Sequence, residues 1–224
     1  MSHLSSLRRA NCMQRVKELS VFRLPAKEPK KHAAVLVPLC KTETDQLSLL
    51  YTLRSSSLRS HSGQVCFPGG THDEQDADLI ATALRETEEE IGLQPNLVEP
   101  WGFLPKVPSK NFEVWVHPVI AEIRNLALDS LRVNRDEVEQ VFLESLDTLC
   151  DEASFSTTDY KIGRTVLTMP VFQGEHHKIW GLTAVITFQL LMCLVPERFS
   201  PQMQLLSGKN GFPMPPSFLT SSKL

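Results

Sequence analysis

The sequence predicts an α/β domain, and three apolar patterns support this prediction. Residues 32–40 and 47–54 are short apolar runs, which are typical of buried β-strands. Residues 80–91 instead repeat apolar side chains at helical spacing, and their charged residues lie on a separate arc. Residues 180–194 form the strongest apolar segment. At 15 residues the segment is shorter than the roughly 20 that a membrane span needs, so we expect a buried C-terminal helix.

The N-terminal segment comes before the first predicted strand. Residues 2–20 are weakly amphipathic and carry four basic residues with a single acid, Glu18. Two interpretations stay open: a mitochondrial transit peptide, or a helix that packs on the domain. Pro25, Pro29 and the lysines that follow indicate a linker, so a separate first segment is expected over residues 1–31.

The middle of the chain contains four further stretches that predict strands: residues 98–104, 113–123, 136–150 and 160–172. The third stretch includes the apolar residues 141–143 and, after them, a predicted short helix. Together with the runs described above, these stretches place one domain over residues 32–195. The remaining residues, 196–224, form a C-terminal tail whose last part is polar and rich in proline. The sequence contains no internal repeat.

Composition narrows the class of protein. The 224 residues are enough for one well-buried domain, and 42% hydrophobic with 22% charged residues is ordinary for a globular protein. A net charge of −3 gives no reason to expect nucleic-acid binding. The five cysteines are scattered without metal-ligand spacing, which indicates free thiols in a reducing compartment. Cys40 and Cys193 lie in apolar runs and are expected in the core.

An acidic run over residues 85–93 is the strongest functional signal. Glu86, Glu89 and Glu90 stand at i, i+3 and i+4, so they share one face of the predicted helix. Gly92 follows these glutamates and fits the C-cap of this helix. Carboxylates so close repel one another, and near a helix C-terminus they also oppose the helix dipole. A bound Mg²⁺ would relieve both costs. The alternative is a solvated acidic face with Arg85 as a counter-charge.

Residues 70–93 resemble the Nudix box, in which a glycine is followed by a loop and an acidic helix. The second half matches at every defined position: Arg85, Glu86, Glu89, Glu90, Gly92 and Leu93. The first half departs from the pattern, because its acidic residue is Asp76 and the interval from Gly70 to Arg85 is one residue longer than usual. This departure puts the role of Asp76 in doubt and leaves the helix intact.

A second motif lies upstream and is similar to the one that marks the coenzyme A branch of the Nudix hydrolases. Its defined residues are Thr52, Arg54, Ser55, Arg59, Gly63 and the run from Phe67 to Gly70. Arginine suits bidentate contacts with phosphate, and glycine lets the backbone approach a ligand closely. The alternative is a strand followed by an ordinary polar loop with a Pro-Gly-Gly turn. Residues 180–184 also resemble a sequence of this branch.

The resemblance implies an α/β/α sandwich with a mixed central sheet and metal-dependent hydrolysis of coenzyme A or acyl-coenzyme A. The products would be 3′,5′-ADP and (acyl-)4′-phosphopantetheine, with Mg²⁺ or Mn²⁺ as cofactor. Two other functions stay open. One is a Nudix pyrophosphatase that acts on NADH or ADP-ribose. The other is a Nudix-fold domain that only binds a ligand.

The resemblance also implies roles for single residues. Glu86 and Glu90 would bind metal, with Glu89 as a shared ligand or general base, and the Gly70 carbonyl would be a further ligand. Arg85 would orient a neighbouring carboxylate, while Glu88 points away from the cluster. Substrate would contact four residues of the upstream motif: Arg54, Arg59, Gly63 and Gly69. Because the base in Nudix enzymes can come from outside the box, three further acids are candidates: Asp136, Glu137 and Glu139.

The chain ends Ser222-Lys223-Leu224, which is the tripeptide read by the peroxisomal import receptor. Three fixed residues occur by chance in roughly one chain in eight thousand, so coincidence is a poor explanation. We therefore expect a peroxisomal protein, with the mitochondrion as the alternative because of the basic N-terminal segment. Acyl-chain preference, the preferred metal and the oligomeric state have no visible signature in the sequence.

Overall fold

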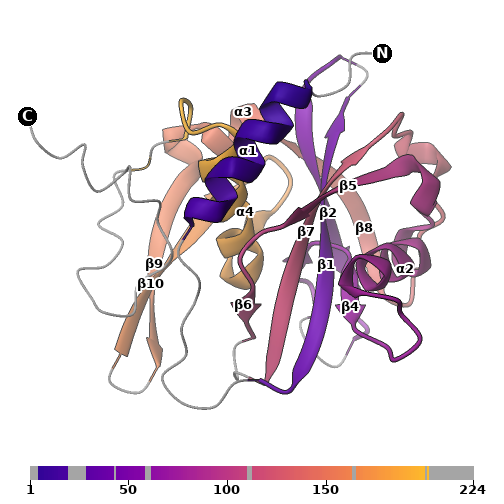
Figure 1. The fold of residues 1–224 in the computed structure, drawn as a ribbon. Coiled ribbons are helices and arrows are strands. Elements are labelled where there is room, and N and C mark those ends of the chain that lie inside the picture. Colours follow the sequence, from indigo (N-terminus) through magenta and orange to yellow (C-terminus); the bar gives the residue numbers. More distant parts are fainter. Residues whose placement is uncertain are drawn as a thin grey trace, which may run out of the picture.

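A computed structural model describes residues 5–19, 29–42, 44–58, 62–109, 113–162, 165–199 and 201. Within these ranges the chain forms layers of helix and sheet, which confirms the predicted α/β class (Figure 1). The largest layer is an eight-stranded sheet of β1 (Lys31–Lys41), β2 (Leu47–Arg54), β3 (Val65–Cys66), β4 (Gly69–Thr71), β5 (Val98–Phe103), β6 (Val107–Pro108), β7 (Val114–Ile123) and β8 (Val138–Ser145).

The large sheet is mixed, as expected. Strand β1 runs parallel to β7 and antiparallel to β2 and β4. Strand β8 pairs with β2 along the edge of β2 that faces away from β1. This pairing brings the end of β2 and the start of β8 together, because Arg54 lies opposite Val138. Both the upstream motif and the segment before β8 therefore reach the same part of the sheet.

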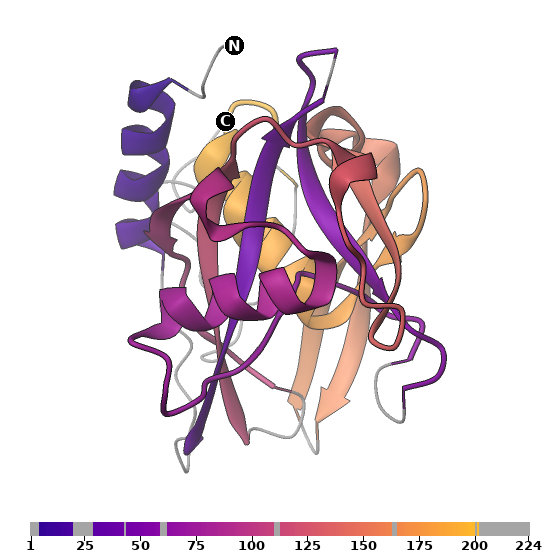
Figure 2. The ribbon, with the colours of Figure 1, turned by 90° about the vertical axis from the view of Figure 1, so that its right-hand side faces the viewer.

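Two hydrophobic cores cover the two faces of the large sheet. Helix α2 (Leu79–Ile91) lies on one face, where Ala34, Leu36 and Ala83 are fully buried (Figure 2). The other face packs against α4 (Gly181–Leu194) and includes Leu49 and Tyr51 of β2. The alternation along β2 follows from the strand period of two, which sends successive side chains to opposite faces.

A smaller sheet of three strands lies beside α4. It consists of β9 (Phe155–Ile162), β10 (Thr165–Gln173) and β11 (Lys178–Ile179), all antiparallel. Residues 160–172 contain strand, as expected, but they belong to two strands rather than one. Strand β9 ends at Ile162 and β10 begins at Thr165, opposite it, so the stretch that the sequence presents as continuous divides between two paired strands.

Short helical segments connect the strands. They are α3 (Leu146–Cys150), η1 (Pro95–Leu97), η2 (Leu128–Ser130) and η3 (Glu152–Ser154). Helix α3 confirms the short helix predicted after residues 141–143. Ser145 begins it by accepting a hydrogen bond from the backbone N–H of Thr148 at 3.0 Å.

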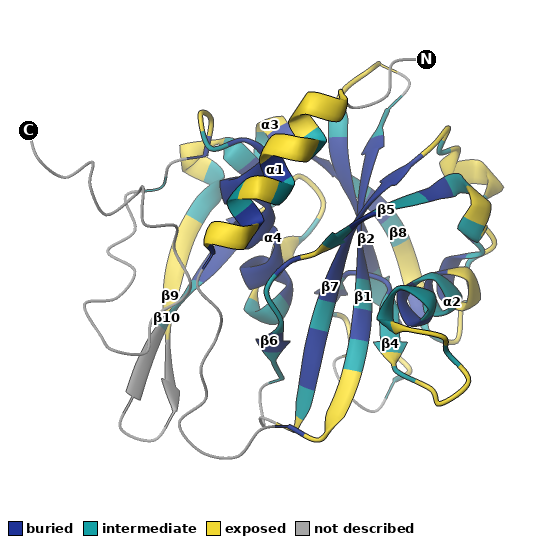
Figure 3. Ribbon diagram, viewed as in Figure 1, coloured by how far each residue is buried: buried dark blue, intermediate teal, exposed yellow. Residues whose placement is uncertain are grey.

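The helices behind the large sheet differ in burial, as Figure 3 shows. Residues 183–194 of α4 are all buried, which confirms the predicted core helix. Helix α1 (Ser6–Glu18) buries only one side, at Cys12 and Val16. In the part of the chain that the structure describes, no helix is both long and apolar enough to cross a membrane.

Helix α1 belongs to the folded domain, which agrees with the second interpretation of the N-terminal segment. Arg9 donates to the carbonyl oxygen of Pro100 at 3.1 Å and pairs with Glu99 at 2.5 Å. Arg15 donates to the carbonyl oxygen of Cys193 at 3.1 Å, at the end of α4. Two of its four basic residues are thus used in packing contacts. The expected tail, apart from its first residues, lies outside the described ranges, and so does the terminal tripeptide.

Candidate active site

Helix α2 carries the acidic run and has well-defined ends. Asp78 begins the helix by accepting a hydrogen bond from the backbone N–H of Ala81 at 2.8 Å. Gly92 ends it in the left-handed conformation, with φ of 70°, as the sequence predicts. Ala83 and Ile91 are fully buried against the sheet, so the opposite face turns toward β4 and the surface.

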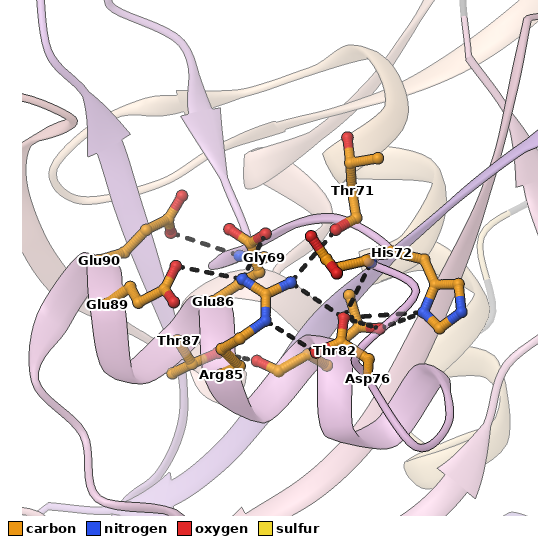
Figure 4. A network of polar contacts seen from close by, with 12 residues as sticks. Gly69, Thr71, His72, Asp76, Thr82, Arg85, Glu86, Thr87, Glu89 and Glu90 are labelled. Atoms are coloured by element: carbon orange, nitrogen blue, oxygen red, sulfur yellow. Dashed lines mark hydrogen bonds and ion pairs between the residues drawn. The ribbon is translucent and has the colours of Figure 1, made fainter.

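The three glutamates of the box share this face but differ in burial. Glu90 is only 3% exposed, whereas the exposed fraction of the side chain is 18% for Glu86 and 57% for Glu89. Glu88 is exposed and accepts a hydrogen bond from Gln94, away from the other three. Burial thus varies along the shared face: Glu90 and Glu86 are the more buried members, and Glu89 is exposed. Figure 4 shows the three side chains together.

The two glycines of β4 lie directly against these carboxylates. The backbone N–H of Gly69 donates to Oε2 of Glu90 at 3.3 Å. A Cβ atom on Gly70 would lie 2.3 Å from Oε2 of Glu86, and one on Gly69 would lie 2.3 Å from the carbonyl oxygen of Ala34. Only glycine fits at position 69, where the clash is with backbone and φ is 146°, whereas a methyl group at position 70 would displace the Glu86 carboxylate. The glycine backbone and the two carboxylates therefore lie close together.

Arg85 is the centre of a polar network that joins the loop after β4 to α2 (Figure 4). Its guanidinium donates to both carboxylate oxygens of Asp76, at 2.8 and 3.0 Å, and to the carbonyl oxygen of Thr71 at 3.3 Å. It also donates to Glu86 at 3.1 Å and to Glu89 at 3.2 Å. The guanidinium holds the pKa of Asp76 well below its ordinary value. Asp76, whose role the sequence leaves in doubt, is therefore the bidentate partner of Arg85.

Burial makes the ionised carboxylates at this site costly. Removal from water raises the pKa of Glu90 to about 7, although the Gly69 N–H and the nearby Arg54 charge act in the opposite direction. Burial likewise raises the pKa of Glu86, against the attraction of Arg85. A cation between the two carboxylates would compensate for this cost.

The chemistry of these donors fits a hard divalent cation. Two carboxylates and the backbone oxygens of a glycine pair are the type of ligand that Mg²⁺ takes, with water or phosphate completing its shell. No three acidic, histidine or cysteine side chains converge into a ready metal-binding group within the described ranges. The fit therefore rests on Glu86, Glu90 and the close approach of Gly70.

Arg54 brings positive charge to the most buried member of this face. It stands at the end of β2, and its charge attracts Glu90. Its Nε atom is buried and has no hydrogen-bond partner. The loop that follows is closed by a hydrogen bond from Gly63 N–H to the Arg54 carbonyl oxygen at 3.1 Å. A buried, unmet donor on a guanidinium is suited to an anionic group such as phosphate. Arg59 lies outside the described residues.

The three further acids that the sequence proposes as a base differ in burial and surroundings. Asp136 and Glu139 are exposed, whereas Glu137 is half-buried. The negative charge of Glu137 contributes to raising the pKa of both Glu86 and Glu90, so Glu137 lies in their neighbourhood. Its carbonyl oxygen also accepts a hydrogen bond from Ser55 N–H at 2.8 Å. Sequence reasoning had no means of choosing among three acids within four positions.

Fold and site together define an α/β protein with a loop-and-helix unit in which an arginine, a strand with two glycines and glutamates of differing burial lie together. The NUDIX domain family matches residues 30–165. That match covers more than half of the chain, and the chain belongs to the Nudix family of hydrolases. The resemblance seen in the box residues is thereby confirmed.

Several characterised proteins are similar over most of the chain. The mitochondrial coenzyme A diphosphatase NUDT8 of Mus musculus is 44% identical over 173 residues, which cover 76% of this chain and 81% of that protein. Its Homo sapiens counterpart is 43% identical over 195 residues, with coverage of 84% and 81%. Nudix hydrolase 3 of Caenorhabditis elegans is 38% identical over 180 residues, with coverage of 73% for both chains. Each likeness extends well beyond the box.

Proposed function

We propose that this chain hydrolyses the diphosphate of coenzyme A and acyl-coenzyme A to 3′,5′-ADP and (acyl-)4′-phosphopantetheine. The observation that supports the proposal most is the position of Arg54, whose buried Nε lacks a partner and whose charge attracts Glu90. It brings the upstream motif to the acidic site, where a diphosphate needs both cations and carboxylate-bound metal. Two relatives named coenzyme A diphosphatase support the same substrate.

In this proposal Glu86, Glu90 and the Gly70 carbonyl hold one or more divalent cations, Mg²⁺ or Mn²⁺. When bound, the metal neutralises phosphate charge and lowers the pKa of the attacking water. Arg85 fixes the orientation of Glu86 through the hydrogen bond at 3.1 Å. Glu89 is exposed and bound by the same arginine, so it is a peripheral member of the set.

The chain's own residues then bind the substrate and accept the proton. Arg54, Arg59, Gly63 and the Gly69 backbone contact the substrate and its phosphates. A water oxygen bonds to one phosphorus while the bond from that phosphorus to the bridging oxygen breaks, and the other phosphate leaves. The proton of the water passes to a carboxylate, for which Glu137 is better suited than Glu89, because no arginine hydrogen bond to it is seen among the described residues.

The test combines a substrate panel with a matched pair of variants. Purified protein is incubated with Mg²⁺ and coenzyme A, an acyl-coenzyme A, NADH or ADP-ribose, and the products are identified. Release of 3′,5′-ADP from the coenzyme A compounds alone supports the proposal, whereas cleavage of NADH or ADP-ribose instead would refute it. Glu90→Gln should lose nearly all turnover without unfolding. Glu88→Gln, on the exposed side of the same helix, should keep it. Full activity of Glu90→Gln would rule out the metal assignment.

For localisation we propose import into peroxisomes through Ser222-Lys223-Leu224, with the mitochondrion as the alternative. The terminal tripeptide supports the first, and two relatives named mitochondrial support the second. A fluorescent protein fused to the N-terminus leaves the tripeptide free, and one fused to the C-terminus blocks it. Peroxisomal signal in the first fusion and its loss in the second are expected. Mitochondrial signal in the C-terminal fusion, with no peroxisomal signal in the N-terminal fusion, would overturn the peroxisomal assignment.

A further inference from the structure

The segment between Arg132 and Val138 rests on the end of the box helix. The backbone N–H of Asn134 donates to the carbonyl oxygen of Glu90 at 2.9 Å. A second close approach lies at Gly92, the residue that ends the helix. A Cβ atom on Gly92 would lie 2.8 Å from both the Cβ and the backbone nitrogen of Arg132. The absence of a side chain at Gly92 therefore lets this segment lie directly on α2.

The same segment is tied to the upstream motif at its other end. Ser55, which follows Arg54, donates its backbone N–H to the carbonyl oxygen of Glu137 at 2.8 Å. From Asn134 to Glu137, four residues thus span the distance between the metal-binding helix and the phosphate-binding strand end. The position of Glu137 is set from both sides of the site.

Asn134 organises these four residues through both its backbone and its side chain. Its carbonyl oxygen accepts the N–H groups of Glu137 at 3.1 Å and of Val138 at 2.9 Å. Its side-chain Oδ1 accepts the N–H of Asp136 at 3.2 Å, which is the Asx-turn typical of asparagine. Its Nδ2 donates to Oε1 of Glu137 at 3.3 Å.

These contacts also determine which way the Asn134 amide faces. A backbone N–H can only donate, so the atom facing Asp136 must be the amide oxygen. The NH₂ group is therefore the one that faces Glu137. One carboxylate oxygen of Glu137 accepts this donor at 3.3 Å, on the segment that the Asn134 N–H ties to the Glu90 carbonyl oxygen.

We propose that Asn134 is a positioning residue for the hydrolysis, because its side-chain amide holds the Glu137 carboxylate where it accepts the proton of the attacking water. The inference rests on the proposed function for the identity of the substrate and for Glu137 as the proton acceptor. Loss of the amide donor leaves Glu137 free to rotate, and groups that orient a reacting carboxylate typically matter about 10- to 100-fold.

Two substitutions separate this role from a merely structural one. Asn134→Asp keeps the oxygen that accepts from Asp136 but replaces the donor toward Glu137 by a second carboxylate oxygen. Asn134→Ser also keeps an acceptor for the turn, and it is too short to reach Glu137. Both variants should keep the melting temperature within a few degrees and lower kcat about 10-fold or more, with KM little changed. Arg135→Lys, an exposed neighbour in the same turn, serves as the control and should match wild type.

A double-mutant cycle decides whether Asn134 acts through Glu137. In a Glu137→Gln background, Asn134→Ser should cost little more, because its target is already gone. The same loss in both backgrounds would overturn the proposal, and so would wild-type kcat in both Asn134 variants. Turnover is expressed relative to wild type with whichever compound of the substrate panel the wild-type enzyme cleaves. Failure of coenzyme A as substrate is thereby distinguished from failure of the positioning role.

Discussion

Replacing Gly70 by alanine tests whether Glu86 must keep its place at the site. The added methyl carbon would lie 2.3 Å, 2.4 Å and 2.6 Å from the three terminal atoms of the Glu86 side chain. Ordinary contacts of this kind begin near 3.4 Å, so the carboxylate must retreat by about 1 Å. The atoms that clash belong to the end of a flexible side chain, and the backbone of β4 has room to stay unchanged.

A displacement of about 1 Å in a catalytic group typically costs about 10²-fold in rate. We therefore expect kcat/KM of Gly70→Ala to fall about 100-fold, which corresponds to about 2.7 kcal/mol of lost transition-state stabilisation. The melting temperature should change by only a few degrees, because the clash is relieved by moving one side chain. Loss of activity without loss of stability is the expected signature.

The assay is release of 3′,5′-ADP from coenzyme A with Mg²⁺, measured beside thermal unfolding. Gly181→Ala is the matched control, because a Cβ atom there meets nothing within 4 Å. It should lose about 1 kcal/mol of stability from its positive φ and keep its activity. Combining Gly70→Ala with Glu86→Gln should cost little beyond Glu86→Gln alone. Wild-type kcat/KM in Gly70→Ala, or full additivity in the double variant, would refute the reasoning.

Three further outcomes are expected. Deleting residues 1–19 removes the buried face of α1 from the core, and the free energy of unfolding in urea should fall by about 4 kcal/mol or more. Burial and neighbouring cations lower the pKa of His117 to about 4. Between pH 6.5 and 4 the imidazole is therefore protonated in the unfolded chain but neutral in the folded chain. The contribution of His117 to stability is then complete above pH 6.5 and is lost as pH falls toward 4. In urea titrations, the free energy of unfolding of His117→Gln should fall less between pH 7 and 5 than that of wild type. Chelation of divalent cations should abolish turnover. Mg²⁺ should raise the melting temperature of the wild-type protein more than that of Glu90→Gln.

Local patterns in the sequence predict the elements well where burial and periodicity agree. Strand β2 spans Leu47–Arg54, as the apolar run indicates, and α4 ends at Leu194, the last residue of its apolar segment. Strands β9 and β10 were missed as two strands, since the run over residues 160–172 does not reveal a break between them. Which strands pair is likewise hidden, because pairing joins residues far apart in sequence.

The candidate site divides in the same way between local and distant contacts. A single helix carries Arg85, Glu86, Glu89 and Glu90, so their common face follows from helical spacing alone. The difference in burial between Glu90 and Glu89 does not follow from spacing, because β4 covers one end of that face and leaves the other open. The role of Asp76 was hidden for a similar reason: its partner lies nine residues away across a loop.

Glu137 shows what a sequence lacks when a site is assembled from separate elements. Three acids occur between residues 136 and 139, and residue type does not distinguish them. The choice depends on two backbone hydrogen bonds, from Asn134 to the Glu90 carbonyl oxygen and from Ser55 to the Glu137 carbonyl oxygen. Every residue type except proline has the same backbone N–H and carbonyl groups, so no pattern of residue types predicts these contacts. The physical signal left in the sequence is indirect: Gly92, read as a helix cap, is also the position whose missing side chain lets this segment reach the site.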